Sequence, residues 1–318
     1  MAIAGVGVPR AGVGTARHRS VRPVLPEPST TLELPDGRLL ACDDVGDPGG
    51  AAVVYLHGAP DCRLARHPDD GLAAAAGIRL VAVDRPGYGW SDPPAPDLLT
   101  FGDELGQLLD HLGIDRCALA AWSAGVPWAF GTAAALGDRV TRVVTYGAVA
   151  PLEAFTDDAV VADSGPRADI AAGVASGDTT ADEVADELAM LLVPSPPVPI
   201  EQARDQIVET VAPASLDALE AEGLVEALAW SLAAAVDRHA DAGVRCDVLM
   251  QFRPGVAEVL GEVTSPVVLV HGDRDRVAGP AVGRWLAGRL PAATVEIWAG
   301  AGHDGLLLDW PRFLSLAR

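Results

Sequence analysis

One serine in the chain has the surroundings of an activated nucleophile. Ser123 lies in the pentapeptide Ala121–Gly125, after an apolar run and before a helical stretch over residues 127–136. A sharp strand-to-helix turn here would expose the hydroxyl at the carboxyl edge of a sheet, and it needs small residues two positions on either side. The usual pattern has glycine at both positions, so we expect Ala121 to crowd the turn without preventing it. The alternative is a serine that only caps a helix.

The candidate partners of this serine lie far along the chain. A serine hydroxyl is a weak nucleophile and needs a base within hydrogen-bonding distance, which an acid then orients. His303 is the best candidate base, because it lies in a glycine-rich loop between the last apolar run and a final helical segment. Asp275, which follows another apolar run, is the preferred acid, and Asp273 is its rival. The order serine, aspartate, histidine differs from the orders in other serine-hydrolase folds.

Acyl transfer also requires hydrogen-bond donors for the negative oxygen of a tetrahedral intermediate. The backbone N–H of Ala124, just after the candidate nucleophile, is the first such donor. The second is expected from the loop after an early strand, which reads His57-Gly58-Ala59-Pro60 and places the N–H of Ala59 for this role. The alternative for this loop is an ordinary turn at the end of a strand.

Strand-like apolar runs recur along the chain, separated by stretches rich in alanine and leucine. The first two flank a hairpin-type turn at Pro35-Asp36-Gly37. The later ones are continuous, which is typical of parallel strands covered by helices on both faces. The pattern predicts an α/β fold with a doubly wound, mostly parallel sheet that opens with a hairpin. The expected strands are residues 30–34, 38–44, 52–56, 78–83, 116–122, 140–146, 266–270 and 294–298.

One connection breaks this alternation of strands and helices. The stretch between Val149 and Val263 contains no convincing strand, but it has helical apolar spacing and proline breaks. We expect residues 152–245 to form a helical cap inserted between the core segments 30–151 and 246–318. Residues 1–29 are rich in arginine, glycine and proline and predict a disordered leader, with an organellar transit peptide as the alternative.

Composition argues against several classes of function. The 318 residues hold 23 lysines and arginines against 44 aspartates and glutamates, a formal net charge of −21, so neither nucleic acid nor an anionic membrane is an expected partner. The longest apolar runs are much shorter than the ~18–20 residues that cross a bilayer. The four cysteines are widely spaced, which argues against a zinc site or a disulfide framework and favours free thiols in the cytoplasm.

These motifs together resemble the α/β-hydrolase fold superfamily, over about residues 30–318. They occur in the order of that family, and they are His57–Pro60, Asp84–Asp92, Ala121–Gly125, His271–Asp275 and Gly300–His303. The resemblance implies an eight-stranded core with the insertion as a cap over the active site. It implies that Ser123 is the nucleophile, His303 the base and Asp275 the acid. For Asp84–Asp92 it implies a mainly structural role.

The resemblance leaves the substrate open. We expect a carboxylesterase-like hydrolase that cleaves a small-molecule ester through an acyl-enzyme and needs no metal or organic cofactor. Trp122 and Trp128, with the cap, favour a modest apolar acyl or alcohol group, although tryptophans are as often part of a core. Serine at position 123 argues against epoxide hydrolases and haloalkane dehalogenases, which use aspartate there. Members that cleave amides or C–C bonds, perhydrolases and a non-catalytic binding protein are the alternatives.

Overall fold

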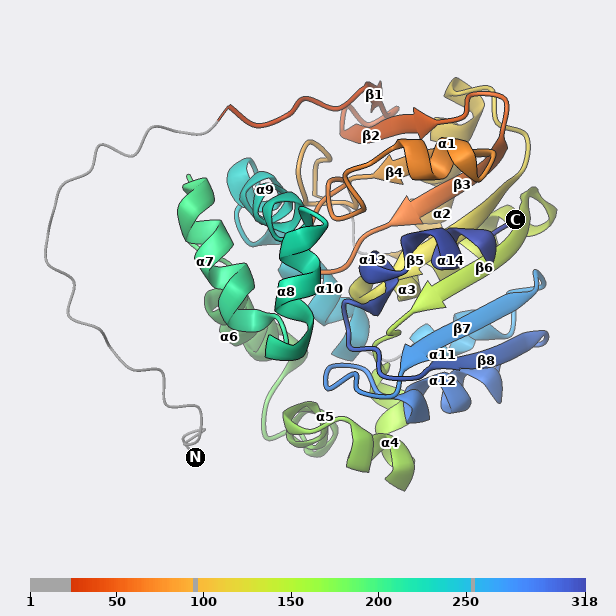
Figure 1. Ribbon diagram of the computed structural model, residues 1–318. Coiled ribbons are helices and arrows are strands. Elements are labelled where there is room, and N and C mark those ends of the chain that lie inside the picture. The colour runs from red at the N-terminus through yellow and green to blue at the C-terminus, as the bar shows by residue number, and fades with distance from the viewer. Residues whose placement is uncertain (1–23, 94–96, 253–254) are drawn as a thin grey trace, which may run out of the picture.

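The computed structural model describes residues 24–93, 97–252 and 255–318, and this part of the chain folds around one eight-stranded sheet (Figure 1). The strand order is β1-β2-β4-β3-β5-β6-β7-β8. β2 pairs antiparallel with both β1 and β4, and the remaining neighbours are parallel. The strands are β1 (Thr30–Glu33), β2 (Leu39–Gly46), β3 (Ala51–Leu56), β4 (Ile78–Val83), β5 (Cys117–Trp122), β6 (Val140–Tyr146), β7 (Val267–Gly272) and β8 (Ala293–Trp298). The predicted doubly wound sheet is confirmed, and every strand begins and ends within two residues of its predicted position.

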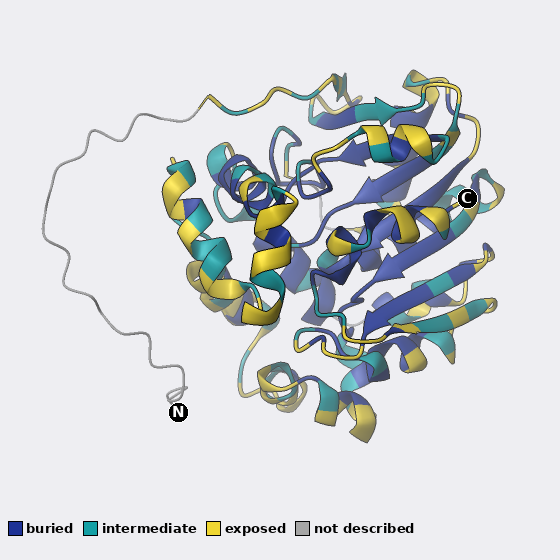
Figure 2. Cartoon of the chain, viewed as in Figure 1, coloured by how far each residue is buried: buried dark blue, intermediate teal, exposed yellow. Residues whose placement is uncertain are grey.

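Helices cover both faces of the sheet, so the central strands are buried on each side (Figure 2). In β3, Val54 and Leu56 belong to one apolar cluster, while Val53 and Tyr55 belong to the other, because successive side chains of a strand point to opposite faces. The first cluster includes residues of α2 (Leu98–His111), α3 (Val126–Leu136) and α12 (Pro280–Ala287). The second includes residues of α1 (Gly71–Ala75), α13 (Gly305–Leu308) and α14 (Trp310–Ser315).

Among its described residues, the chain between β6 and β7 contains helices and connecting loops but no strand. After the short 3₁₀ turn Leu152–Thr156, its helices are α4 (Asp158–Asp163), α5 (Pro166–Ser176), α6 (Ala181–Leu192), α7 (Ile200–Thr210), α8 (Pro213–Ala221), α9 (Leu224–Asp237), α10 (Ala242–Phe252) and α11 (Val256–Leu260). Helices α6 to α9 stand at the end of the sheet to which the parallel strands point (Figure 1). The expected boundary between residues 245 and 246 falls inside α10, which packs against α6, so the helical insertion continues past it.

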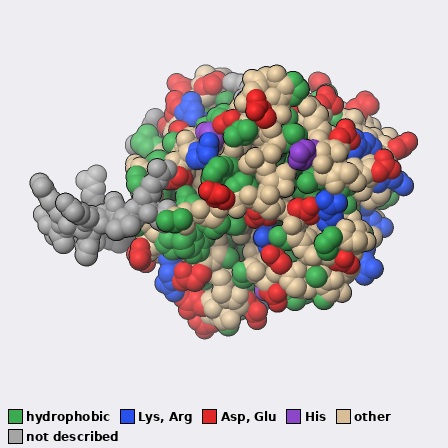
Figure 3. All heavy atoms as spheres, turned by 90° about the horizontal axis from the view of Figure 1, so that it is seen from above, with side chains coloured by type: hydrophobic (Ala, Val, Ile, Leu, Met, Phe, Trp, Pro, Cys, Tyr) green, Lys and Arg blue, Asp and Glu red, His purple; other side chains and the backbone are tan. Residues whose placement is uncertain are grey.

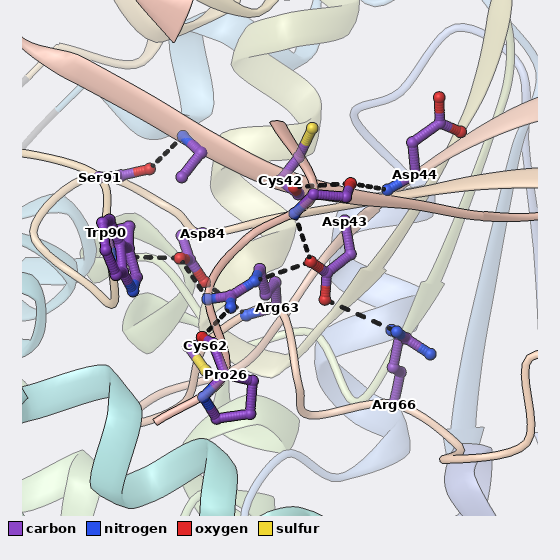
Figure 4. Close-up of polar contacts among 12 residues, drawn as sticks. Pro26, Cys42, Asp43, Asp44, Cys62, Arg63, Arg66, Asp84, Trp90 and Ser91 are labelled. Atoms are coloured by element: carbon purple, nitrogen blue, oxygen red, sulfur yellow. Dashed lines mark hydrogen bonds and ion pairs between the residues drawn. The ribbon is translucent and has the colours of Figure 1, made fainter. Parts of the chain in front are cut away.

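Part of the expected leader, residues 1–29, is described by the structure and contacts the core. Residues 1–23 lie outside the described part of the chain, but the segment that follows is tied to the core. The carbonyl oxygen of Pro26 accepts a hydrogen bond of 2.5 Å from the Arg63 guanidinium (Figure 4). The backbone N–H of Ser29 donates to the Asp43 carboxylate at 3.1 Å. Buried side chains of the core therefore supply partners for the backbone of the segment before β1.

The structure shows the state of the cysteines, the distribution of surface charge and the length of the helices. All four cysteine side chains are buried and none forms a disulfide, and burial raises the pKa of Cys42 and of Cys117 to about 12. These two thiols therefore stay protonated at neutral pH. Acidic side chains are spread over the face drawn in Figure 3, interspersed with basic ones. Within residues 24–93, 97–252 and 255–318, the helices are all too short or too polar to span a bilayer.

Candidate active site

Ser123 occupies a tight turn between β5 and α3. Its backbone has φ of 52°, a left-handed conformation that is strained for a residue with a side chain, and only 7% of its surface is exposed. A Cβ on Gly125 would lie 2.5 Å from the carbonyl oxygens of Leu56 and His57, so only glycine fits there. Ala121 is fully buried in the core beside β3 and β6, and the turn forms with this methyl group in place.

Three predicted site residues lie in one hydrogen-bonded chain. Nε2 of His303 is 3.0 Å from the Ser123 hydroxyl, and Nδ1 is 2.8 Å from Oδ2 of Asp275. An ionised carboxylate only accepts hydrogen bonds, so the imidazole carries its proton on Nδ1. This leaves Nε2 as an acceptor for the serine proton, which is the tautomer that a general base needs.

The environment of Asp275 keeps its carboxylate ionised. Burial pushes its pKa upward, but the charge and hydrogen bond of His303, together with backbone N–H donors, bring the pKa below its ordinary value. Those backbone donors are Val277 at 2.8 Å and Ala278 at 2.9 Å, both to Oδ1. The rival Asp273 instead accepts a hydrogen bond of 2.7 Å from the N–H of Gly300. The contact with the imidazole thus comes from Asp275, while Asp273 ties two loops together.

Residues of β5 and β6 hold the histidine loop in place. The indole N–H of Trp122 donates to the carbonyl oxygen of His303 at 2.9 Å, and the two rings lie 5.7 Å apart. The hydroxyl of Tyr146 donates to the carbonyl oxygen of Gly302 at 2.7 Å. Gly147 has φ of +58°, and a Cβ there would lie 2.9 Å from the His303 ring. No sequence motif marks Tyr146 or Gly147, although both come at the carboxyl end of the strand beside β5.

Trp128, which we expected to contact the substrate, is buried in the core. It is 1% exposed within the core cluster of α3, and its ring meets that of Phe101 edge to face at 5.2 Å. Its indole N–H donates to the carboxylate of Asp247 at 2.8 Å. A side chain so enclosed has no surface to offer a substrate, so the expected substrate contact by Trp128 is not supported. Helix α3 turns this residue inward, which spacing along the sequence could not reveal.

The loop that carries Ala59 lies against the serine turn. A Cβ on Gly58 would be 3.2 Å from the Cβ of Ser123 and 3.5 Å from the Trp122 ring, so the missing side chain allows this close approach. Ala59 and Ala124, the two expected donors for the oxyanion, are each partly exposed on the two sides of this contact.

The same loop carries a carboxyl group that no sequence motif marks. Asp61 is 7% exposed, and burial raises its pKa to about 6, against the opposing effects of the Ser231 hydroxyl and the charges of Arg85 and His303. The Ser231 hydroxyl, on α9, also accepts a hydrogen bond of 2.9 Å from the N–H of Cys62. One serine of the insertion thus binds two consecutive residues of the loop.

Among the described residues, no group of three or more His, Cys, Asp or Glu side chains could hold a metal ion.

His57 is excluded as the base, although it lies near Ser123. Its Nε2 accepts a hydrogen bond of 3.0 Å from the N–H of Arg85, so the ring proton is on Nδ1, 2.6 Å from the carbonyl oxygen of Gly58. A proton on Nε2 would clash with the hydrogen of the Arg85 N–H. Burial, reinforced by the charge of Arg85, holds the pKa of His57 well below its usual value.

We predict that His57 stays neutral, with its proton on Nδ1, in the folded protein at pH 5.5. Histidine in the unfolded chain binds a proton below pH ~6.5, whereas folded His57 does not. This group therefore stabilises the fold above pH ~6.5, and its contribution falls by up to about 1.4 kcal/mol per pH unit below that. Long-range ¹⁵N–¹H spectra of the imidazoles test this, with His57→Gln identifying the resonance. A doubly protonated His57 ring at pH 5.5 in folded protein would contradict it.

Comparison with known proteins gives matches to hydrolases. The α/β hydrolase fold family model matches residues 51–309. An uncharacterised hydrolase of Saccharomyces cerevisiae is 28% identical over 130 residues, which are 40% of this chain and 44% of the yeast protein. Epoxide hydrolase 1 of Siraitia grosvenorii is 33% identical over 120 residues, 33% of this chain and 37% of that protein. Each match thus spans less than half of the curated relative.

Solved structures resemble the chain over nearly its whole length. An esterase from a Rhodococcus species has a TM-score of 0.62 and 23% identity, covering 90% of this chain and 95% of that one. A hydrolase from Pseudomonas aeruginosa has a TM-score of 0.65 and 20% identity, covering 91% and 96%. The TM-scores establish a shared fold, and at identities below 25% they establish the fold alone. With the family model matching most of its length, and with the strand order described above, the chain belongs to the α/β-hydrolase fold family.

Proposed function

We propose that the protein is a serine hydrolase that cleaves a carboxylic ester of a small, partly apolar molecule. The observation that carries this proposal is the chain from Ser123 through His303 to Asp275, with contacts of 3.0 Å and 2.8 Å. A nucleophile, a base in the required tautomer and an orienting acid are the three groups that acyl transfer needs. The helical insertion between β6 and β7 serves as the cap over this site.

The reaction proceeds in two halves. Nε2 of His303 takes the hydroxyl proton as Oγ of Ser123 attacks the ester carbonyl, and Asp275 stabilises the imidazolium that forms. The N–H groups of Ala59 and Ala124 hold the negative oxygen of the tetrahedral intermediate. The ester C–O bond then breaks as His303 gives its proton to the leaving alcohol. The acyl group remains bound to Oγ of Ser123 as an ester. Water, activated by the same histidine, then hydrolyses that ester and restores the free hydroxyl.

The identity of the nucleophile separates this proposal from epoxide hydrolysis. An aspartate that opens an epoxide forms an ester, which water can hydrolyse. A serine that opened an epoxide would form an ether, which water does not cleave under these conditions. Ser123 therefore suits an acyl substrate, and the likeness to epoxide hydrolase 1 covers only 33% of this chain. The esterase fold shared with the Rhodococcus enzyme is consistent with ester cleavage.

A panel of p-nitrophenyl esters from acetate to octanoate tests the proposed function. We expect turnover of the shorter esters, because the substrate is small and partly apolar, and a loss of at least ~10⁴-fold in kcat for Ser123→Ala. Ser176→Ala, an exposed serine at the end of α5, is the matched control and should keep full activity. Absence of turnover across the panel, or turnover that survives in Ser123→Ala, would refute ester hydrolysis at this serine.

Gly147 supplies a second prediction, on the placement of the base. In Gly147→Ala the new Cβ would lie 2.9 Å from the His303 ring and 3.1 Å from the Asp275 carboxylate, so the imidazole must move. We expect kcat to fall at least ~10-fold, because small misplacements of reacting groups lower rates strongly.

The control for this prediction is Gly137→Ala. Gly137 also has a positive φ of +51°, but nothing lies within 4 Å of its Cβ position. Both substitutions place a side chain at a positive φ, which strains the backbone, so both variants should lose stability. Equal kcat values for the two variants would show that Gly147 does not constrain the base.

A further inference from the structure

A fully buried arginine binds the loop that carries Ala59. Arg85 follows β4 and is 0% exposed. Its Nε donates to the carbonyl oxygen of His57 at 2.8 Å, and its Nη2 donates to the carbonyl oxygen of Gly58 at 2.9 Å. The Gly58 carbonyl also receives the Nδ1–H of His57 at 2.6 Å. Two donors thus fix the direction of the Gly58 carbonyl.

The direction of that carbonyl determines where the Ala59 N–H points. The carbonyl of Gly58 and the N–H of Ala59 belong to one planar trans peptide, so they point in opposite directions. With the carbonyl held on Arg85, the N–H is turned away from the arginine. Gly58 itself approaches Ser123, since its Cβ position lies 3.2 Å from the serine Cβ. The guanidinium therefore sets the orientation of the second proposed oxyanion donor.

Asp247, on α10, fixes the guanidinium from the other side. Its two carboxylate oxygens bind the two terminal nitrogens of Arg85, with Oδ2 at 2.9 Å from Nη2. Oδ2 also accepts from the hydroxyl of Tyr88 at 2.6 Å, and Oδ1 accepts from the indole N–H of Trp128 at 2.8 Å. Burial opposes the charge on Arg85, but Asp247 more than restores it, so the pKa of the arginine is raised.

The helical insertion packs closely against the turn that follows Arg85. A Cβ on Gly87 would lie 2.8 Å from the backbone nitrogen of Gly243 in α10, and a Cβ on Gly243 would lie 2.5 Å from the Tyr88 ring. The N–H of Gly89 donates to the carbonyl oxygen of Ala235 in α9 at 3.0 Å. Helices α9 and α10 of the insertion thus hold the turn that follows the arginine.

We propose that Arg85 and Asp247 are positioning residues for the Ala59 oxyanion donor, so that the insertion helix α10 acts on the reaction through this buried pair. The proposal rests on the proposed acyl transfer at Ser123. It gives the stretch Asp84–Asp92 a part in the reaction, beyond the structural role that the family resemblance implied.

A second buried arginine nearby provides the matched control. Arg63 is also 0% exposed, and it binds Asp84 at 3.0 Å, Asp43 at 3.0 Å and the carbonyl oxygen of Pro26 (Figure 4). Its guanidinium donates to no carbonyl of residues 57–59 among the hydrogen bonds of the described chain. Replacing either arginine by lysine leaves a buried pair poorly satisfied, because one ammonium cannot match the planar fork of a guanidinium.

The test compares Arg85→Lys with Arg63→Lys on the best ester of the panel. We expect both variants to lose stability, but only Arg85→Lys to lose kcat, by ~10²-fold with KM nearly unchanged, as for the loss of one oxyanion donor. Active sites are counted by titration with a fluorophosphonate, so that kcat refers to folded enzyme. Asp247→Asn should lower kcat in the same way, and the double variant Arg85→Lys/Asp247→Asn should fall little further, because both residues act through one group.

The outcomes separate this inference from the proposed function. A wild-type enzyme that hydrolyses no ester refutes the proposed function itself. An active wild type with equal kcat per active site in Arg85→Lys and Arg63→Lys refutes the positioning role alone. If Arg85→Lys does not fold, Asp247→Asn decides, since it preserves the shape of the carboxylate. An unchanged kcat in that variant, or additive losses in the double variant, would also overturn the proposal.

Discussion

The hydrogen bond between His303 and Asp275 is the contact on which the site depends. The Asp275 carboxylate is ionised and already accepts hydrogen bonds from two backbone N–H groups, so it can only accept a further hydrogen bond, which the Nδ1–H of the imidazole donates. That choice leaves Nε2 open toward Ser123, 3.0 Å away. The three residues come from the ends of β5, β7 and β8, so a common carboxyl edge of the sheet is what brings such distant positions together.

Buried polar contacts, in addition to packing, set the loops at this edge. Tyr146 and Trp122 bind carbonyl oxygens of the histidine loop, while Arg85 binds carbonyl oxygens of the loop before Ala59. Loops carry backbone groups without partners in the sheet, and burial makes each unpaired group unfavourable. Each of these side chains therefore selects one loop conformation. These three side chains thus help to determine where donors and acceptors of the site point.

The sequence predicted the features that are local or repeat along the chain. Continuous apolar runs are read directly, so all eight strands were placed within two residues. Ser123, Asp275 and His303 could be selected because each follows a predicted strand, and strand ends meet in a parallel sheet. The boundary expected after residue 245 falls inside α10, because the helix continues through it. Trp128 lies in the core because the rotation of α3 decides which side chains face inward. The contacts of Arg85 with Asp247 join positions 162 residues apart, and no local pattern encodes them.

The most direct test of the account is the site of reaction with a fluorophosphonate probe, read by mass spectrometry of the digested protein. If Ser123 is a nucleophile activated by His303, the wild type carries one adduct, on the peptide that contains Ser123. Ser123→Ala carries no adduct, and His303→Gln reacts far more slowly. An unlabelled wild type, or an adduct on another residue that persists in Ser123→Ala, would contradict the account.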